Sequence, residues 1–392
     1  FHLDFSDNSS NAALGTDSSG NNNTWTVNNL SAGANIANKG FDVLTYTGTG
    51  SSQTVGGLAF QPDLVWIKSR TSTADHELYD SVRGATKRLF PSLNNGETTL
   101  TNGLTGFTSN GFTLGGHGGT SGSSTNYVAW SWKAGGAATT NNDGNISASV
   151  SANTAYGFSI VKYTGTGSTS GSVGHGLGST PQMVIVKNLA TGDWKVRHTS
   201  LGSTEMASLN ENYLANTASW NGETSSVFYP ARVGDNYLNV NTEEYIAYCW
   251  SEVPGFSKFG SWTGNGSSSG PTITLGFKPR WVLFKRTDQS GDNWTIFDTA
   301  RDSGTLNFGL QPNVSLEEQN FGNREILVSD TGFQVTSTGS SSNETGGTYI
   351  YAAFAEGSSD EIDSLLDSPT NYEANSGNNG GNYATWNPLY GI

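Results

Sequence analysis

The sequence predicts an all-β protein made of three tandem antiparallel β-sandwich repeats, jelly-roll-like in plan, with irregular segments at both ends. The first observation is the composition: of 392 residues, 51 are Gly and only 13% are charged, which is typical of short strands joined by many turns. The second is the presence of 18 Phe, 15 Tyr and 11 Trp, which indicates order rather than disorder. The third is that no segment is amphipathic with a helical period over three turns; the nearest, residues 361–366, is too short.

The repeats are recognised by their first two strands. A Gly-Phe pair followed by an alternating run and a Thr-Gly-x-Gly turn begins at Gly40, Gly157 and Gly255, and it aligns Phe41, Phe158 and Phe256. Each start is followed by a proline and an apolar run that ends in lysine, at residues 62–68, 181–187 and 279–285. Such runs predict strands buried on both faces. We expect Pro62, Pro181 and Pro279 at equivalent strand starts, and Trp66 and Trp281 buried inside their own repeats.

The later strands repeat as well. A third strand is predicted at residues 76–80, 194–198 and 294–298, and a closing strand at residues 127–132, 245–250 and 349–354. In the first repeat, Asn110-Gly111 between alternating apolar residues predicts a β-hairpin over residues 106–114, and residues 329–335 are its counterpart in the third.

These landmarks divide the chain into six segments. Residues 137–156 are rich in Asn, Ala, Thr and Ser, with Ile146 and Val150 as the large apolar residues, and we interpret them as a linker. The predicted segments are an N-terminal segment 1–39, repeat 1 at 40–136, the linker 137–156, repeat 2 at 157–254, repeat 3 at 255–357 and a C-terminal connecting segment 358–392.

Charge and cysteine content narrow the function classes. With 19 basic and 33 acidic residues the net charge is −14, so we expect neither nucleic acid nor an anionic membrane as partner. No apolar run is long enough to predict membrane insertion. The single cysteine, Cys249, is expected to be a small buried residue in the closing strand of repeat 2. The sequence begins with Phe1 inside a strand-like run, which we interpret as a segment of a longer polypeptide.

No catalytic constellation is found in the sequence. The nucleophile elbow, the phosphate-binding loop and the His-Glu-x-x-His and Cys-x-x-Cys metal motifs are all missing, and the five histidines have no metal-ligand spacing. The Thr-Gly-Thr-Gly stretches at Thr47 and Thr164 are interpreted as hairpin turns. Adjacent acids on a strand point to opposite faces and cannot flank one bond, which applies to Glu243-Glu244, Glu317-Glu318 and Asp360-Glu361. The sequence therefore predicts a protein that is not an enzyme and has no cofactor.

Three residues are candidates for binding. Asp17 opens a run of Asp, Ser and Asn that offers oxygens to calcium, with an Asx-type turn as the alternative. Trp194 and Trp294 are candidate platforms on which a sugar ring could stack. Because both occupy the repeat position of His76, a scaffold role is the alternative for them.

Several segments resemble a known group of proteins. Residues 41–68, 80–84, 111–115 and 127–133 resemble an uncharacterised domain that recurs in predicted tail-fibre and other virion proteins of marine phages, especially cyanophages. Residues 3–21 resemble the end of a laminin-G-like, concanavalin A-type lectin domain, and residues 363–372 with 380–389 resemble the stretch that follows it. Residues 206–241 fit poorly. The resemblance implies no catalytic or binding residues.

What the resemblance implies is a place on the virion surface after assembly in the host cytoplasm. The expected function is that of a structural appendage subunit, a tail fibre or similar fibre, that mediates attachment to the host. The expected partners are further copies of the chain in a trimer or filament, other virion proteins, and a host surface glycan or protein. The alternatives are a bacterial extracellular adhesin or filament subunit and, third, a polysaccharide depolymerase. If the two ends are parts of one module interrupted by the repeats, Asn35 and Ser358 should lie close together.

Overall fold

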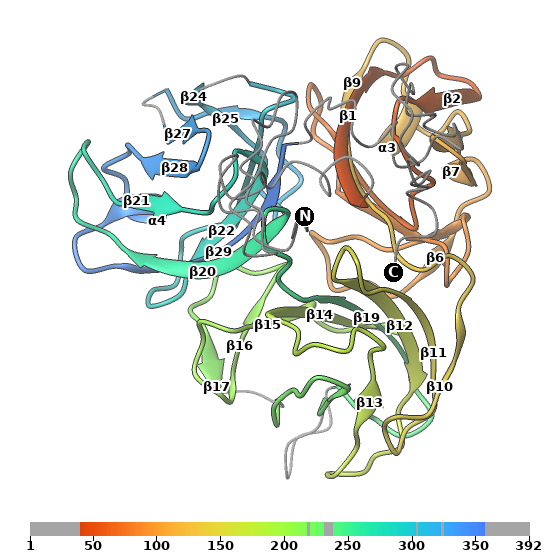
Figure 1. Cartoon of the computed structure of the whole chain (residues 1–392). Helices are drawn as coiled ribbons and strands as arrows, with labels where there is room; N and C mark the ends of the chain where they lie inside the picture. Colours follow the sequence, from red (N-terminus) through yellow and green to blue (C-terminus); the bar gives the residue numbers. More distant parts are fainter. Residues whose placement is uncertain (1–39, 218–219, 231–237, 303–304, 323–324, 357–392) are drawn as a thin grey trace, which may run out of the picture. The chain divides into compact units, whose positions relative to one another are not determined.

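The described part of the chain is nearly all β-structure. The computed structural model describes residues 40–217, 220–230, 238–302, 305–322 and 325–356, so the expectations for both terminal segments lie outside the described residues. Two helices of four residues each, α3 (Gly118–Ser121) and α4 (Ser340–Asn343), lie among the strands. The predicted fold class, antiparallel β-sandwich repeats, is confirmed (Figure 1).

Each repeat is built on the same antiparallel sheet, in which the strand order is first strand, closing strand, apolar-run strand and third strand. In repeat 1 the order is β1 (Phe41–Thr47), β9 (Asn126–Trp132), β3 (Leu64–Ser69) and β4 (Glu77–Asp80). In repeat 2 it is β12 (Phe158–Thr164), β19 (Glu244–Trp250), β14 (Met183–Asn188) and β15 (Lys195–His198). In repeat 3 it is β20 (Ser257–Thr263), β29 (Thr348–Ala355), β22 (Pro279–Arg286) and β23 (Thr295–Asp298).

The strand register confirms that the apolar runs are equivalent. Leu64, Met183 and Trp281 lie opposite Trp132, Trp250 and Phe354 of the closing strands. One alignment was wrong by a residue: Ser257, and not Phe256, pairs with Phe354 as Phe41 pairs with Trp132. The register is set at the other end of the strand, where an aromatic ring before the Thr-Gly turn stacks on the closing-strand tyrosine. The stacked pairs are Tyr46–Tyr127, Tyr163–Tyr245 and Trp262–Tyr349.

A second, smaller sheet packs on one face of each main sheet. In repeat 1 it contains β2 (Gln53–Gly56), β8 (Gly111–Leu114) and β7 (Leu104–Thr108), and in repeat 2 it contains β13 (Val173–Gly174) and β18 (Val227–Phe228). In repeat 3 it contains β21 (Thr272–Thr274), β28 (Gly332–Val335), β27 (Ile326–Ser329) and β24 (Thr305–Leu306). Both predicted hairpins form, as β7–β8 and β27–β28. The short strands β5 (Lys87–Arg88) with β6 (Thr98–Thr99) and β25 (Phe308–Gly309) with β26 (Gln319–Asn320) form two-stranded pieces.

The segment predicted as a linker is part of a sheet. Strands β10 (Thr139–Asn141) and β11 (Ala148–Asn153) extend the main sheet of repeat 2, and β11 pairs with β12 through six residue pairs. On the other side, β16 (Glu205–Ser208) and β17 (Asn216–Thr217) complete eight strands. The linker interpretation was wrong because Ile146, Ala148 and Val150 of this segment are buried in the repeat 2 core, and β11 pairs with β12 along its whole length.

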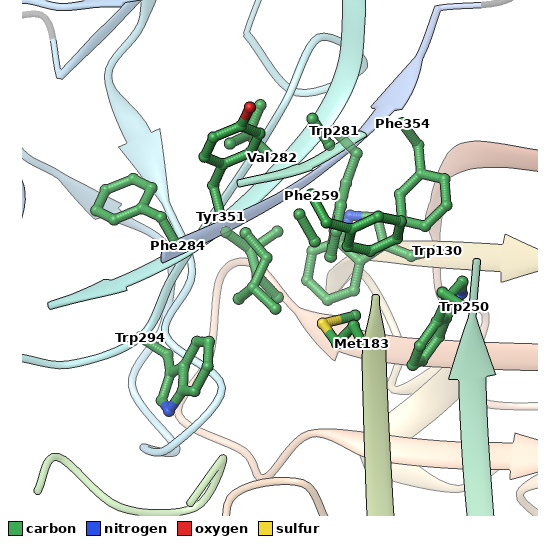
Figure 2. Close-up of a cluster of buried hydrophobic side chains, with 14 of the residues drawn as sticks. Trp130, Met183, Trp250, Phe259, Trp281, Val282, Phe284, Trp294, Tyr351 and Phe354 are labelled. Atoms are coloured by element: carbon green, nitrogen blue, oxygen red, sulfur yellow. The ribbon is translucent and has the colours of Figure 1, made fainter. Parts of the chain in front are cut away.

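The free face of each main sheet packs in a core that all three repeats share. Figure 2 shows Trp130 of repeat 1, Met183 and Trp250 of repeat 2, and Trp281 and Phe354 of repeat 3 in this cluster. Ring centroids lie close across the boundaries between repeats: Phe41 to Trp281 at 6.0 Å, Trp132 to Phe158 at 6.5 Å and Trp132 to Trp250 at 6.0 Å. Residues 36–357 accordingly form one compact unit and not three separate sandwiches.

The tryptophans of the apolar runs are buried, as predicted, but not where we expected them. Trp66 is 3% exposed and Trp281 is 1% exposed. Both lie in the core shared by the repeats and not inside their own sandwiches. A run buried on both faces therefore has two different covers: its own second sheet on one face and the neighbouring repeats on the other.

Candidate functional site

The boundaries between repeats hold several of the polar and aromatic side chains that the sequence offers for chemistry. The loop after the third strand of each repeat donates or accepts backbone hydrogen bonds with a segment of another repeat. The bonds join Ala74 to Ser315, Glu97 to Leu189 and Ala215 to Thr287, at 2.8–2.9 Å. Repeat 1 thus contacts repeat 3, repeat 2 contacts repeat 1, and repeat 3 contacts repeat 2. The three boundaries, here called seams, form a closed cycle of contacts.

The candidate sugar platforms Trp194 and Trp294 are part of these seams. Their exposed fractions are 0% and 2%, so neither indole presents a face to solvent. The Nε1 of Trp194 donates to the carbonyl of Phe90 at 2.8 Å, and the Nε1 of Trp294 donates to the carbonyl of Ser208 at 2.9 Å. As binding platforms these two residues were wrong candidates, because each ring is needed to close a seam.

His76 occupies the same position in repeat 1 and likewise forms a hydrogen bond across a seam. Its Nδ1 accepts from Trp66 Nε1 at 2.9 Å, so its Nε2 carries the proton and donates to the carbonyl of Gln311 at 3.1 Å. Burial lowers the pKa of His76 well below its usual value, and the ring is neutral. The sequence equivalence of Trp194, Trp294 and His76 therefore indicated a scaffold function, which was the alternative interpretation.

Three buried lysines lie at equivalent positions of the repeats, and two of them, Lys68 and Lys187, also donate across a seam. Lys68, Lys187 and Lys285 end the apolar runs and are all 0% exposed. Their ammonium groups donate to backbone carbonyls, as Lys187 Nζ does to Asn188 and Gly192 at 2.8 Å and, across the seam, to Asn94 at 3.3 Å. Burial lowers the pKa of each lysine to about 8. These amines cannot meet a substrate, because protein surrounds them.

Two seams also contain a buried aspartate and arginine three residues apart. Arg301 Nε lies 2.6 Å from Asp298 Oδ2, and neither side chain is exposed; Asp80 and Arg83 form the same pair in repeat 1. Each aspartate accepts a hydrogen bond from the next repeat, from Trp130 Nε1 at 2.9 Å and from the Tyr248 hydroxyl at 2.7 Å. Both carboxylates are therefore held by structural partners on each side of a seam.

The third seam has histidine in place of this pair. His198 Nδ1 accepts from the backbone N–H of Ser200, and its Nε2 donates to the carbonyl of Tyr351 at 2.9 Å. Burial lowers the pKa of His198 to about 4. The neutral ring thus replaces an ion pair with a single hydrogen bond across the seam.

One polar cluster lies outside the seams and reaches the surface. In repeat 1, Glu77 Oε1 lies 2.9 Å from His117 Nε2 and accepts from Arg88 at 3.2 Å, and Glu77 Oε2 accepts from the Tyr79 hydroxyl at 2.5 Å. Glu77 is nearly buried, whereas the side chains of His117 and Arg88 are 28% and 16% exposed. A Cβ at Gly119 would lie 2.0 Å from Glu77 Oε1, so any other residue there would displace the Glu77 carboxylate from this position.

Sequence reasoning missed this cluster because Glu77 and His117 are far apart along the chain. The signal that could have found it is the run Gly115-Gly116-His117-Gly118-Gly119, which brings a backbone close to another strand. Repeats 2 and 3 have Lys195 and Thr295 in the place of Glu77, so the cluster belongs to repeat 1 alone. Both oxygens of Glu77 are already bonded, which leaves an imidazole and a guanidinium as the groups that reach solvent.

The other acidic candidates have structural partners. Glu318 bridges Arg70 at 2.9 Å and Arg301 at 2.7 Å, while Glu244 pairs with Lys162 at 2.8 Å. Within residues 40–356 as described, no group of three or more His, Cys, Asp or Glu side chains could hold a metal ion. Asp17 and Asp360-Glu361 lie outside the described residues. Among the described helices, none is long and apolar enough to cross a membrane.

The Thr-Gly-x-Gly turns form three copies of one loop. They are not hairpin turns, because β1 and β2, β12 and β13, and β20 and β21 belong to different sheets in each repeat. The second glycine has a positive φ in every copy, at Gly50 (+70°), Gly167 (+70°) and Gly266 (+66°). In repeats 2 and 3 the buried side-chain amides of Asn239 and Asn343 donate to loop carbonyls, those of Ser168 and Ser267. Exposed Ser and Thr side chains are left at the loop tips.

The fold and these contacts define a class of protein: an all-β scaffold in which three repeats are fused through one core and three seams, with equivalent loops at the surface. Residues 37–358 match the family described as Domain of unknown function (DUF7483), and the chain therefore belongs to that family. The matched range nearly coincides with the compact unit of residues 36–357. No curated protein matches the chain.

Proposed function

We propose that the chain is a structural subunit of a surface appendage, such as a phage tail fibre, that displays loops for attachment to a host surface. The observation that carries the proposal is that the charged and aromatic candidate residues are buried in the seams, where they hold the repeats together. Trp194, Trp294, Asp80 and Asp298 stabilise the scaffold, and what reaches solvent at equivalent positions is a set of loops rich in Gly, Ser and Thr. This division suits a protein that holds variable loops in a fixed arrangement.

The resemblance to virion proteins of marine phages supports a virion context. Three similar loops on one rigid unit would also allow weak contacts to add up, because linked sites bind with an effective concentration that a single site lacks. Self-association into a trimer or filament, contact with other virion proteins, and a host glycan or protein as the receptor are parts of the same proposal. A bacterial adhesin or filament subunit with the same architecture is the rival.

Two experiments test the proposal. Antibodies raised against the protein should label appendages of intact marine phage particles in immunogold electron microscopy. Labelling of bacterial surface filaments and not of phage particles would favour the rival.

Attachment is tested with the fluorescently labelled protein on a panel of marine bacterial and cyanobacterial strains. A variant with lysine at Ser52, Thr169 and Ser268, exposed residues of the three loops, should bind a recognised strain about tenfold less and keep its melting temperature. The matched control carries lysine at Ser109, Ser225 and Thr331, exposed residues elsewhere in the three repeats, and should bind like the parent. Equal loss in both variants would contradict attachment through the loops, and release of sugars from host polysaccharide would favour a depolymerase.

A further inference from the structure

The first strand lies at the edge of the four strands that the main sheets have in common, and among the described residues repeat 2 alone adds a strand beside it. There, β11 pairs with the whole of β12. Among the described residues no strand pairs with the corresponding outer side of β1 in repeat 1 or of β20 in repeat 3. The same strand edge is therefore paired in repeat 2, whereas no described strand pairs with it in repeats 1 and 3.

The backbone of β1 directs its odd-numbered residues away from the sheet. The N–H of Val43 is bonded to Asp42 Oδ1 at 2.7 Å, and the carbonyl of Val43 accepts from Arg280 at 3.3 Å, so both groups face away from β9. Thr45 and Thr47 follow on the same side of the strand, and both are exposed. Side chains cap the inner end of this edge, whereas no described strand pairs with its outer end, where an added strand would find donors and acceptors.

Repeat 2 shows what such an added strand looks like. Val161 pairs with Val150 of β11 and is 0% exposed, and Tyr163 pairs with Ala148. The serines between them, such as Ser149, lie on the opposite face. The strand that covers the edge is therefore short and antiparallel, with small apolar residues at alternate positions.

Repeat 1 presents the matching apolar surface without its cover. Leu44 is the counterpart of Val161 and Tyr46 that of Tyr163; both are only partly buried against the repeat 1 core. In repeat 3 the counterpart of Leu44 is Gly260, which offers no side chain to a docked strand. Among the described residues, the outer edge of β1 thus combines backbone that no strand pairs with and apolar side chains that are only partly covered, whereas the edge of β20 has the backbone alone.

We propose that the outer edge of β1 is a docking site for an extended segment of a partner polypeptide. The segment runs antiparallel to β1 and places small apolar side chains, in the manner of Ala148 and Val150, over Tyr46 and Leu44. Main-chain hydrogen bonds to Thr45 and Thr47 supply affinity, and the alternate side chains supply selectivity. This inference does not depend on the proposed attachment function.

The probe for this site is a fluorescein-labelled peptide with the sequence of residues 145–154, Asn-Ile-Ser-Ala-Ser-Val-Ser-Ala-Asn-Thr, measured by fluorescence anisotropy on the full chain. Saturable binding is expected. Thr45→Pro should weaken it by about tenfold or more, because proline removes the outward N–H and leaves the pairing with β9 intact. Ser261→Pro, the same change in β20, is the matched control and should bind like the parent. A peptide with Asp in place of the valine should bind about tenfold more weakly.

Hydrogen exchange and a second variant complete the test. In the free protein the outward amides of residues 41–48 should exchange quickly, and the peptide should protect them. If Thr45→Pro does not fold, Leu44→Gly reproduces the repeat 3 edge and should lower the affinity in the same direction. Protection in the free protein, equal binding by both proline variants, no peptide binding, or a dimer that Thr45→Pro dissolves would each overturn the proposal, the last by making a second copy the occupant.

Discussion

Replacing Lys187 by methionine tests how the seams hold a buried charge. In the folded protein burial lowers the pKa of Lys187 to about 8, against a usual value of 10.5. The folded state therefore binds this proton less tightly than the unfolded state, and below pH 8 the charged amine costs the folded state about 3 kcal/mol, since one pKa unit is worth about 1.4 kcal/mol. The cost disappears as the pH rises past 10.5. Relative to Lys187→Met, the parent should gain about 2.5 kcal/mol of unfolding free energy between pH 7 and pH 10.

The assay is urea unfolding followed by tryptophan fluorescence at several values between pH 7 and pH 10. All other titrating groups are common to both proteins and cancel in the difference. Lys278→Met, at a side chain that is 44% exposed, reports the general effect of removing one positive charge. A difference between the parent and Lys187→Met that stays constant with pH, within about 0.5 kcal/mol, would refute the reasoning. It would mean that the carbonyl oxygens around Nζ solvate the ammonium as well as water does.

Four further outcomes are expected. Trp281→Ala should lower the unfolding free energy by about 3–5 kcal/mol in urea titrations, and a loss under about 1 kcal/mol would contradict its place in the shared core. Arg301→Met leaves the Asp298 carboxylate without its charge partner and should cost about 3–5 kcal/mol, part of which Asp298→Asn should recover in the double variant. The folded pKa of His198, about 4, lies below its usual 6.5, so its stabilising effect is present above pH 6.5 and is lost as the pH falls toward 4. His198→Gln should therefore lose less unfolding free energy than the parent between pH 6.5 and pH 4. An equal loss in both proteins would argue against this role of His198. Burial raises the pKa of the Cys249 thiol, so a disulfide reagent should modify it only as fast as the unit opens, and rapid labelling of the native protein would show that the strand is accessible.

The strands could be predicted from the sequence because their pattern is local. The apolar runs and closing strands lie where periodicity and β-branched content placed them, and Asn110-Gly111 marked its hairpin. The same local signals misjudged residues 137–156, since Ala148 and Val150 become strand residues only when β12 is beside them. A first strand aligned on Phe256 was off by one for a similar reason: the register is fixed by a stacked pair of rings that only the folded sheet brings together.

The arrangement of the repeats was beyond the reach of periodicity. A run buried on both faces, such as the one that contains Trp66, says that two layers cover it, but not that the second layer is another repeat. The same limit applied to the prediction of the candidate site. Trp194 and Trp294 are aromatic residues beside polar turns, a pattern shared by sugar platforms and by seam contacts, and only burial distinguishes the two.

The central place of each closing strand affects how the chain folds during its synthesis. Strands β9, β19 and β29 each insert between two strands that were made earlier, so every main sheet waits for its last strand. The contacts between repeats 1 and 3 wait longest: His76 and Gln311 are 235 residues apart in the sequence, and Trp130 and Asp298 are 168 apart. Repeat 1 must therefore leave the ribosome with one apolar face open and keep it open until repeat 3 arrives. Folding of such a chain is expected to be slow and largely post-translational, with a period in which exposed strands need protection from aggregation.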